Sequence, residues 1–233
     1  MAKFDTTRWS LVLEARESTH DAQTALAALC RTYRPPVLAY IRRHGYVEDV
    51  AEDLTQTFFT HFIEHARHTS ADPSRGRFRA FLLTALKRFL IDCNAEARRL
   101  KRGGAFRFET LADARALEIA DNESPESAFE RDWAITVLDA ALARLRAEAA
   151  SAGKLALFEQ LSEFLTERPD ESDYARVAAA LNLRRNTLAV AVHRLRHRLR
   201  ELVHEEISHT AADREQLDGE LRELRAALSA VLD

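Results

Sequence analysis

The sequence predicts an all-α protein, and three observations support this fold class. Ala, Leu, Arg and Glu dominate the composition, and these residue types are among the better helix formers. Only six Gly and five Pro interrupt the 233 residues. Apolar residues recur at helical spacing in several stretches, whereas the alternation expected of strands is nearly absent. The length suits one large or two modest domains, so we expect helices throughout, in two domains.

The first predicted domain covers residues 1–102. Pro35 and Pro36 divide its N-terminal half, because proline is tolerated in the first turn of a helix but not in its interior. We therefore expect separate helices over 21–33 and 37–44, the second ended by Gly45. The other expected helices are one capped by residues 5–7, one over VEDVAEDLTQTFFTHFIEHA (47–66), and a long one over 77–99 that Gly103 and Gly104 end.

An acidic, aperiodic linker and a second helical domain are predicted to follow. The linker spans 103–125, where polar and turn-forming residues carry no helical period. The second domain spans 126–204. A C-terminal extension over 205–233 carries Leu217, Leu221, Leu224 and Leu228 at heptad-like spacing. The repeat is too short for a coiled coil, so we expect an amphipathic helix that docks on this chain or on a partner.

Residues 174–200, YARVAAALNLRRNTLAVAVHRLRHRLR, favour a helix-turn-helix within the second domain. A short helix leads to Asn182, a residue type comfortable in a left-handed turn, and then to a longer helix. In this motif the second helix lies in the major groove of DNA. Its buried stripe is expected to comprise Leu188, Val192, Leu195, Leu199 and Leu202.

The face opposite that stripe carries side chains suited to DNA. Asn can bond adenine, an apolar side chain can touch the thymine methyl group, and Arg can grip guanine or phosphate. The alternative is a solvated, arginine-rich helix in a bundle. The outward-facing residues are Asn186, Val190, His193 and His197, flanked by Arg194, Arg196 and Arg200.

Charge is segregated along the chain although the net charge is only −3. Segments 75–107 and 184–200 are basic, and 108–132 is acidic. Cations on the first basic segment would displace counterions from a phosphate backbone, so binding should weaken with salt. The alternative is that its Phe residues form the core while the cations only solubilise. The candidate backbone contacts are Lys87, Arg88, Asn94, Arg98, Arg99, Lys101 and Arg102.

The sequence predicts no enzyme, no cofactor and no metal. It shows no serine-histidine-aspartate arrangement, glycine-rich phosphate loop or HExxH motif. His61, His65 and His68 share a helix face at spacing that permits metal ligation, but they lack a Cys or carboxylate partner, which favours a plain polar face.

A cytoplasmic location is expected. Cys30 and Cys93 lie too far apart to suggest a disulfide framework, so they are interpreted as buried thiols in a reducing compartment. No stretch reaches the roughly 20 apolar residues of a membrane span. The N-terminus does not have the form of a signal peptide, so no contact with a membrane is expected.

Four motifs in succession resemble the extracytoplasmic-function group of bacterial RNA polymerase sigma factors, over residues 26–203. LAALCRTYRPPVLAYIRRHG resembles the start of sigma region 2, and EDLTQTFFTHF resembles its polymerase-binding helix. GRFRAFLLTALKRFLIDC resembles the helix that opens and reads the −10 element. YARVAAALNLRRNTLAVAVHRLRHRLRELV resembles region 4, which reads the −35 element.

The resemblance implies three binding surfaces and no catalysis. One surface would dock on the coiled coil of the largest subunit of core RNA polymerase, through Glu52, Asp53, Leu54, Gln56 and Phe59. A second would face the −10 region of promoter DNA, through Arg79, Lys87, Arg88, Asn94 and Arg98. The third would meet the −35 duplex, through Arg184, Arg185, Asn186, Thr187, Val190, His193 and Arg194.

The chain departs from the family pattern in several places. Arg184 replaces a small polar cap, and residues 189–191 (AVA) replace a Lys-Ser-Arg-like run, which implies that readout of the −35 element is either weak or differently encoded. Thr55 stands where relatives carry an aliphatic residue. Together with the RGRFR and KRGG segments, it resembles a subgroup controlled by Ser/Thr kinases, which suggests phosphorylation of Thr55 as an added anionic group for polymerase. The tail after His204 lies outside the two-domain pattern, which suggests a regulatory or self-inhibitory contact for it.

Two other interpretations stay open at this point. The chain fits an ordinary helix-turn-helix regulator whose first half is a sensor or dimerisation module. Such proteins usually dimerise and bind palindromic half-sites about one helical turn apart. The histidine row leaves a helical metal protein as the third interpretation.

Overall fold

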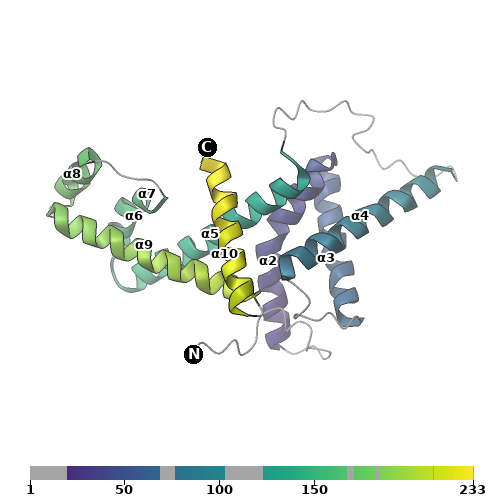
Figure 1. The fold of residues 1–233 in the computed structure, drawn as a ribbon, viewed down its shortest axis with the longest axis horizontal. Helices are drawn as coiled ribbons and strands as arrows, with labels where there is room; N and C mark the ends of the chain where they lie inside the picture. Colours follow the sequence, from purple (N-terminus) through teal and green to yellow (C-terminus); the bar gives the residue numbers. More distant parts are fainter. Residues whose placement is uncertain are drawn as a thin grey trace. The chain divides into compact units, whose positions relative to one another are not determined.

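A computed structural model describes residues 20–68, 77–102, 123–166, 171–181, 184–211 and 213–232, and the regular structure within these ranges is helical (Figure 1). The predicted all-α class is confirmed. The helices are α2 (His20–Arg43), α3 (Glu48–His68), α4 (Phe78–Arg102), α5 (Pro125–Ser151), α6 (Leu155–Leu161), α7 (Glu163–Thr166), α8 (Glu171–Ala180), α9 (Arg185–Ser208) and α10 (Arg214–Leu232).

The chain forms two compact units. Unit 1 comprises residues 1–136 and 207–233, and unit 2 comprises 137–206. This division assigns the first part of α5 and the whole of α10 to the same unit as α2, α3 and α4. The predicted boundaries instead separated a C-terminal extension from the first domain. Residues 103–122 of the predicted linker, the expected first helix and the Asn182 turn lie outside the described residues.

Helix α2 runs without a break through Pro35 and Pro36, so the expectation of two helices separated by the prolines is wrong. Each proline removes a helical N–H donor, which disfavours an interior position. Tyr33, Val37 and Tyr40 form an apolar stripe that crosses the prolines and is at most 2% exposed. Burial of these large side chains offsets the lost hydrogen bonds and keeps the helix continuous.

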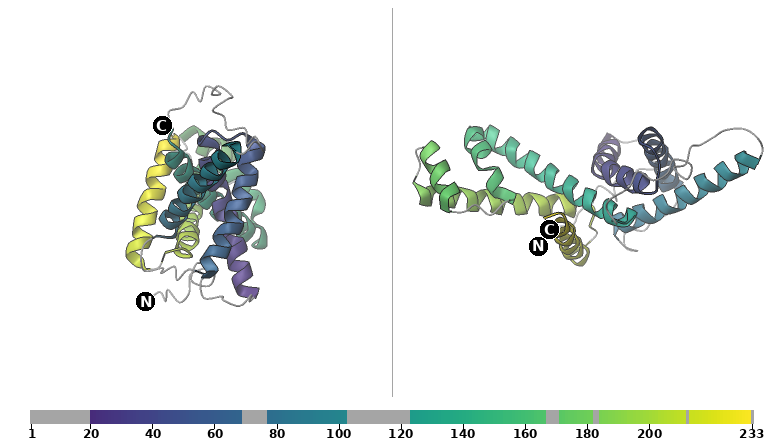
Figure 2. Two further views of the ribbon diagram at one scale, coloured as in Figure 1. Left: turned by 90° about the vertical axis from the view of Figure 1, so that its right-hand side faces the viewer. Right: turned by 90° about the horizontal axis from the view of Figure 1, so that it is seen from above.

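Helices α2 and α3 lie side by side in both ribbon views (Figures 1 and 2), and Gly45 makes the turn between them. Gly45 has a φ of 91°, a left-handed conformation that glycine adopts without a steric cost. Its N–H donates to the carbonyl of Arg42 at 2.9 Å. The prediction that Gly45 ends this helix is confirmed.

Aromatic side chains join α3 and α4 in the core of unit 1. The ring centroids of Phe58 and Phe89 are 5.5 Å apart, and those of Phe62 and Phe78 are 6.3 Å apart. All four of these rings are buried, whereas Phe81 is 41% exposed. Phe78 and Phe89 are therefore core residues, as one of the two interpretations of the basic segment 75–107 expected. Their burial does not decide where the cations of α4 lie.

Two further helices begin at defined caps in unit 1. Ser124 accepts a hydrogen bond from the N–H of Ser127 at 3.0 Å, and Pro125 occupies the first position of α5. Asp213 accepts from the N–H of Gln216 at 2.8 Å at the start of α10. These local signals position the two helices that carry Glu130, Glu220 and Glu223.

Unit 2 is built on a cluster shared by α6, α7, α8 and α9. Arg196 supports it by donating from Nε to the carbonyl of Phe164 at 2.8 Å. The packing of α8 against α9 is the arrangement that a helix-turn-helix requires. The buried members of the cluster are Leu161, Phe164, Val177, Ala178, Leu188 and Val192.

Candidate nucleic-acid interface

Arg79, which the resemblance placed toward the −10 element, is buried in unit 1. Its side chain is 4% exposed, and its guanidinium carbon lies 3.9 Å from the centre of the Trp133 ring. Its Nε lies 3.1 Å from the carboxylate of Glu220, which is itself 5% exposed. In this conformation Arg79 cannot reach DNA, because a side chain on α5 and another on α10 cover it.

The contacts of Arg79 belong to a larger arginine–carboxylate cluster. Arg79 also pairs with Glu130 and Glu223, and Arg77 pairs with Glu223. The Nε of Arg77 lies 3.8 Å from the Glu220 carboxylate. The arginine–carboxylate cluster therefore brings two cations at the start of α4 together with carboxylates from α5 and α10. Its members are Arg77, Arg79, Glu130, Glu220 and Glu223.

The two carboxylates from α10 respond to this environment in opposite directions. Burial raises the pKa of Glu220 above its usual range, although Arg79 and Arg77 act to lower it. Burial also acts upward on Glu223, but the hydrogen bond from Arg77 and the charges of Arg79 and Arg77 lower its pKa overall. Glu220 thus carries the desolvation cost of the cluster, while Glu223 is the well-compensated partner.

The remaining predicted −10 residues differ in how they are held. The Nζ of Lys87 lies 2.8 Å from Glu126, and this hydrogen bond lowers the pKa of Glu126. Asn94 accepts from the Tyr46 hydroxyl at 3.1 Å and donates to the carbonyl of Leu90 at 2.8 Å. Arg99 pairs with Glu96 at 2.7 Å, and Arg88 is exposed. The side chains of Arg98 and Arg102 lie outside the described residues.

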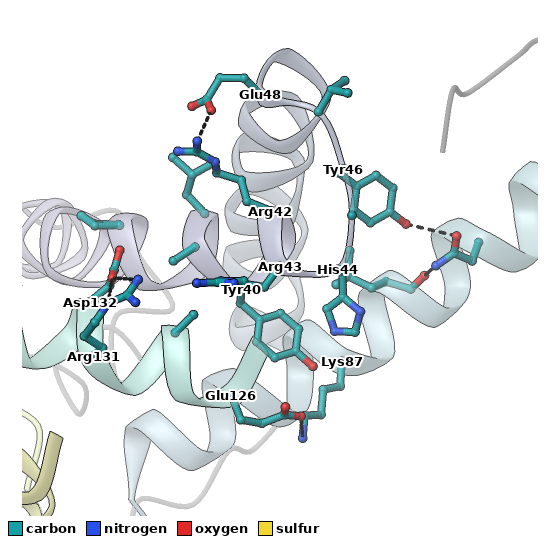
Figure 3. A pocket seen from close by; sticks show the side chains of 18 of the residues that line it. Tyr40, Arg42, Arg43, His44, Tyr46, Glu48, Lys87, Glu126, Arg131 and Asp132 are labelled. Carbon is teal, nitrogen blue, oxygen red and sulfur yellow. Dashed lines mark hydrogen bonds and ion pairs between the residues drawn. The ribbon is translucent and has the colours of Figure 1, made fainter. Parts of the chain in front are cut away.

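Lys87 and Glu126 belong to a pocket lined by α2, α4, the start of α5 and residues 44–48 (Figure 3). Figure 3 shows the Tyr40 ring beside Glu126 and Lys87. Burial, followed by the charge of Glu126, raises the pKa of Tyr40 to about 12. Burial also lowers the pKa of His44. Both shifts favour the neutral form of the ring.

The predicted −35 residues lie on an open surface of unit 2, which we call the α9 outer face. Leu188 and Val192 are buried as expected, and Val190 between them is 50% exposed. His197 has Nδ1 3.4 Å from Glu201. The side chain of Arg185 lies outside the described residues. The exposed members of the face are Arg184, Asn186, Thr187, Val190, His193, Arg194 and His197.

Two other arginines of α9 hold unit 2 together. Arg196 bonds the backbone of α7, as described above. Arg198 pairs with Glu148 at 2.8 Å and with Glu201 at 2.9 Å. The expectation that Arg196 flanks the DNA-facing surface therefore needs amendment, because its guanidinium is engaged with Phe164.

The predicted polymerase-binding residues of α3 divide into exposed and buried groups. Asp53 and Gln56 are exposed, and Phe59 is half-buried. Glu52 pairs with Arg34 on α2. Leu54 is 8% exposed, so it anchors α3 in unit 1 in this conformation.

Thr55, the predicted phosphorylation site, is fully buried. Its exposure is 0%, and its hydroxyl donates to the carbonyl of Ala51 at 2.7 Å. A kinase cannot reach the hydroxyl in this conformation, and a phosphate would place about two negative charges within the core. The neighbouring Thr57 makes the same kind of bond, to the carbonyl of Asp53, from an exposed position.

Sequence reasoning missed the carboxylates of the arginine–carboxylate cluster. A signal for Glu220 was present, since it falls at i+3 from Leu217 and i−4 from Leu224, on the buried stripe of α10. An acidic residue on an apolar stripe calls for a cationic partner, because an unpaired buried charge is very costly. The identity of that partner required the fold, since Arg79 is far from α10 in the sequence, 144 positions before Glu223.

The histidine row and the two cysteines were the candidates for metal binding and thiol chemistry. They contain no group of three His, Cys, Asp or Glu side chains placed to hold a metal ion. His61 is exposed, and the side chains of His65 and His68 are outside the described set. Cys30 and Cys93 are free, half-buried thiols, and burial raises the pKa of each, so neither is an activated nucleophile. No helix in the described ranges is long and apolar enough to span a membrane.

Comparison with known families gives one result that fits this geometry. Residues 29–103 match the family model Sigma-70 region 2. The match covers most of α2 and all of α3 and α4. The match covers less than half of the chain, so it shows a segment similar to Sigma-70 region 2. No curated protein and no solved structure matches the chain.

Proposed function

We propose that the protein is a sigma factor of the extracytoplasmic-function type, which binds core RNA polymerase and directs initiation at promoters with −10 and −35 elements. The observation that carries this proposal is the Sigma-70 region 2 match over α2, α3 and α4. A second compact unit, residues 137–206, follows and supplies a packed helix pair of the kind that reads duplex DNA. A sigma factor directs initiation without catalysis of its own.

The α9 outer face supports recognition of the −35 element. Arg184, Asn186, Val190 and Arg194 are exposed near the start of a helix whose opposite side is buried. In the helix-turn-helix geometry the N-terminal residues of the second helix meet the base edges. Arg suits guanine or phosphate, Asn suits adenine, and Val suits the thymine methyl group. The face therefore offers both backbone contacts and base contacts.

The exposed part of α3 supports docking on polymerase. Asp53, Gln56 and Phe59 are accessible along one stretch of the helix, while Leu54 and Phe58 hold it to the core. An anionic and aromatic surface on a rigid helix suits a complementary coiled coil. We propose that this stretch of α3 contacts the largest subunit of the polymerase.

Phosphorylation of Thr55 is not included in the proposed function, because its hydroxyl is buried. A direct comparison is Thr55→Glu against Thr57→Glu, which add the same charge two positions apart. We expect Thr55→Glu to lower the free energy of unfolding by about 3 kcal/mol or more, since it buries an unpaired charge. Thr57→Glu should change it by less than about 0.5 kcal/mol. Phosphate on Thr55 in protein isolated from cells, with the fold intact, would restore the kinase hypothesis.

The proposed function is tested by binding to purified core polymerase and by initiation on pooled genomic fragments. The wild-type chain should bind the core enzyme and confer initiation at a defined set of start sites. Asp53→Lys should weaken core binding about tenfold, as expected for a reversed charge at an interface. Glu64→Lys is the matched control, because Glu64 is exposed on the same helix outside the proposed surface.

Two results would remove the proposal. One is a chain that neither binds core polymerase nor changes its start sites. The other is a dimer that protects a palindromic duplex without polymerase, which would favour the stand-alone regulator.

A further inference from the structure

Helix α10 places two carboxylates against the two arginines that flank the start of α4. Glu223 pairs with both Arg77 and Arg79, and Glu220 lies 3.1 Å from Arg79. The two contacts of Glu223 join residues more than 140 positions apart in the sequence. The first turn of α4 is therefore occupied by acidic side chains from α10.

The chemistry of these contacts is that of arginine with an oxyanion. Guanidinium groups form paired hydrogen bonds with carboxylates and with phosphates in the same planar geometry. Two arginines at the start of one helix, separated by one residue, would suit adjacent phosphates of a nucleic-acid strand. Glu220 and Glu223 present their oxygens where such phosphates would bind.

Several features make α10 a displaceable ligand. Gly219 in its interior lowers helix propensity. A Cβ at this position would lie 3.1 Å from a guanidinium nitrogen of Arg77, a contact that a small shift of this flexible side chain would relieve. Burial of the Arg79–Glu220 pair removes two charges from water, and such pairs contribute little net stability. The apolar anchors of the helix that are fully covered include Leu217 and Leu224.

We propose that Arg77 and Arg79 form a binding site for the phosphate backbone of promoter DNA, and that α10 is an internal competitor that occupies it. This inference rests on the proposed function, because promoter DNA opened by polymerase is the ligand that displaces the helix. With α10 docked, the −10 surface has its first two cations neutralised. Release of α10 removes Glu220 and Glu223 from both arginines and leaves Glu130 of α5 beside Arg79. It would also uncover Trp133, an aromatic ring on which an unpaired base can stack.

The test compares two doubly substituted full-length chains of equal net charge. Glu220→Lys with Glu223→Lys removes the carboxylates that hold Arg77 and Arg79 and repels α10. Glu215→Lys with Asp218→Lys changes two exposed acids of the same helix that lie outside the cluster. The probe is a short, fluorescently labelled single-stranded DNA of mixed sequence, with binding measured by anisotropy over a range of NaCl concentrations.

The released variant should bind this probe about tenfold more tightly than the control at about 0.1 M NaCl. The slope of log K against log salt concentration should steepen by about 0.7 for Arg77, and by up to about 1.4 if DNA also displaces Glu130 from Arg79. Hydrogen exchange should accelerate over residues 214–232 in the released variant alone. A milder pair of variants, Glu223→Gln and its control Glu215→Gln, serves if the lysine variant folds poorly. Glu223→Gln should bind the probe a few fold more tightly than Glu215→Gln.

Two results would overturn the inference. Equal affinity of the two chains, with exchange in α10 accelerated, would show that the freed arginines do not bind DNA. Loss of protection in α2, α3 and α4 when α10 is released would show that the helix is a structural part of unit 1. Binding to core polymerase, measured on the wild-type chain, separates the two proposals. If the chain binds polymerase and the variants do not differ on DNA, the inference falls and the proposed function stands. If it does not bind polymerase, both fall.

Discussion

The arginines of α4 and those of α9 were both predicted to contact promoter DNA, but their surroundings in the structure differ. Arg79 on α4 is 3% exposed and lies among three carboxylates and a tryptophan ring. Arg184, just before α9, and Arg194, within it, are exposed. A basic segment thus reveals that a helix carries cations, but the acids of other helices decide whether those cations face solvent.

The difference follows from where the acids occur. Segment 184–200 contains no acidic residue, and the first acid of α9 is Glu201. The start of α4 meets α5 and α10, which bring Glu130, Glu220 and Glu223. Under the proposed function, the α9 outer face could bind DNA in the conformation described, whereas the start of α4 would first have to exchange its acidic partners for phosphates.

The largest expected effect is on the free energy of unfolding, when an arginine of α4 and an arginine of α9 are each replaced by alanine. Arg79→Ala leaves Glu220 buried without its main partner, so the free energy of unfolding of unit 1 should fall by about 3 kcal/mol. Arg194→Ala removes an exposed side chain and should change stability by less than about 0.5 kcal/mol. Urea unfolding of both variants checks this, and equal losses would break the comparison.

Arg194→Ala, which should hardly change stability, should have a clear effect on the affinity of unit 2 for duplex DNA. Arg194→Ala removes one expected phosphate or guanine contact, so affinity should fall about tenfold and the salt slope should lessen by about 0.9. Arg146→Ala is the matched control, since Arg146 is an exposed arginine of α5 that pairs with Glu159. Filter binding to a promoter identified by the initiation experiment measures both. A control that weakens binding as much as Arg194→Ala would refute the specific role of the α9 outer face.

Acidification should loosen unit 2 more than it loosens the docking of α10. Hydrogen bonds from Arg198 and Arg144 lower the pKa values of Glu148 and Glu205, so their stabilisation is present above about pH 4.5 and is lost as pH falls through the folded values. These exposed pairs contribute at most about 1 kcal/mol each. In the cluster, the raised pKa of Glu220 makes protonation favour the docked state, which offsets the opposite response of Glu223.

Hydrogen exchange, corrected for intrinsic rates, measures this difference at neutral pH and just below pH 4.5. We expect protection to fall over the end of α5 and over α9 before it falls over α10. The reverse order would show that the buried pair is the acid-sensitive element.

The smallest effect is expected for the exposed ion pair between α4 and α5. The side chains of Lys87 and Glu126 are 44% and 46% exposed, so Glu126→Gln should cost less than about 0.5 kcal/mol. It should also raise affinity for single-stranded DNA slightly, since Lys87 is freed. A cost as large as that of Arg79→Ala would mean that burial does not distinguish the two kinds of paired cation.

Much of the fold was predictable because local periodicity determines it. The stripe of Leu188, Val192, Leu199 and Leu202 is buried as its spacing indicated, and the helical class follows from composition. The continuity of α2 was not predictable from Pro35 and Pro36 alone, since the packing that offsets their cost involves side chains from other helices, such as the contact of Tyr33 with Phe78.

The candidate sites were predictable in part. The exposed face of α9 follows from its own helical period, which needs no other element. Thr55 lies at i+4 from Ala51 and i−3 from Phe58, two core residues, so its burial was readable from the same period that was applied to Leu54 and Phe58. The environment of Arg79 depends on contacts with distant segments, which no local pattern contains.

The fluorescence of Trp133 should report whether α10 is docked. The sequence has two tryptophans, and Trp133 is the one that the described residues include. Its indole lies beneath the Arg79 guanidinium and is 2% exposed. Departure of α10 would admit water to the ring, which shifts indole emission to longer wavelengths. A Trp9→Phe chain would therefore report the occupancy of the cluster through intrinsic fluorescence, without a label and in the presence of DNA or polymerase.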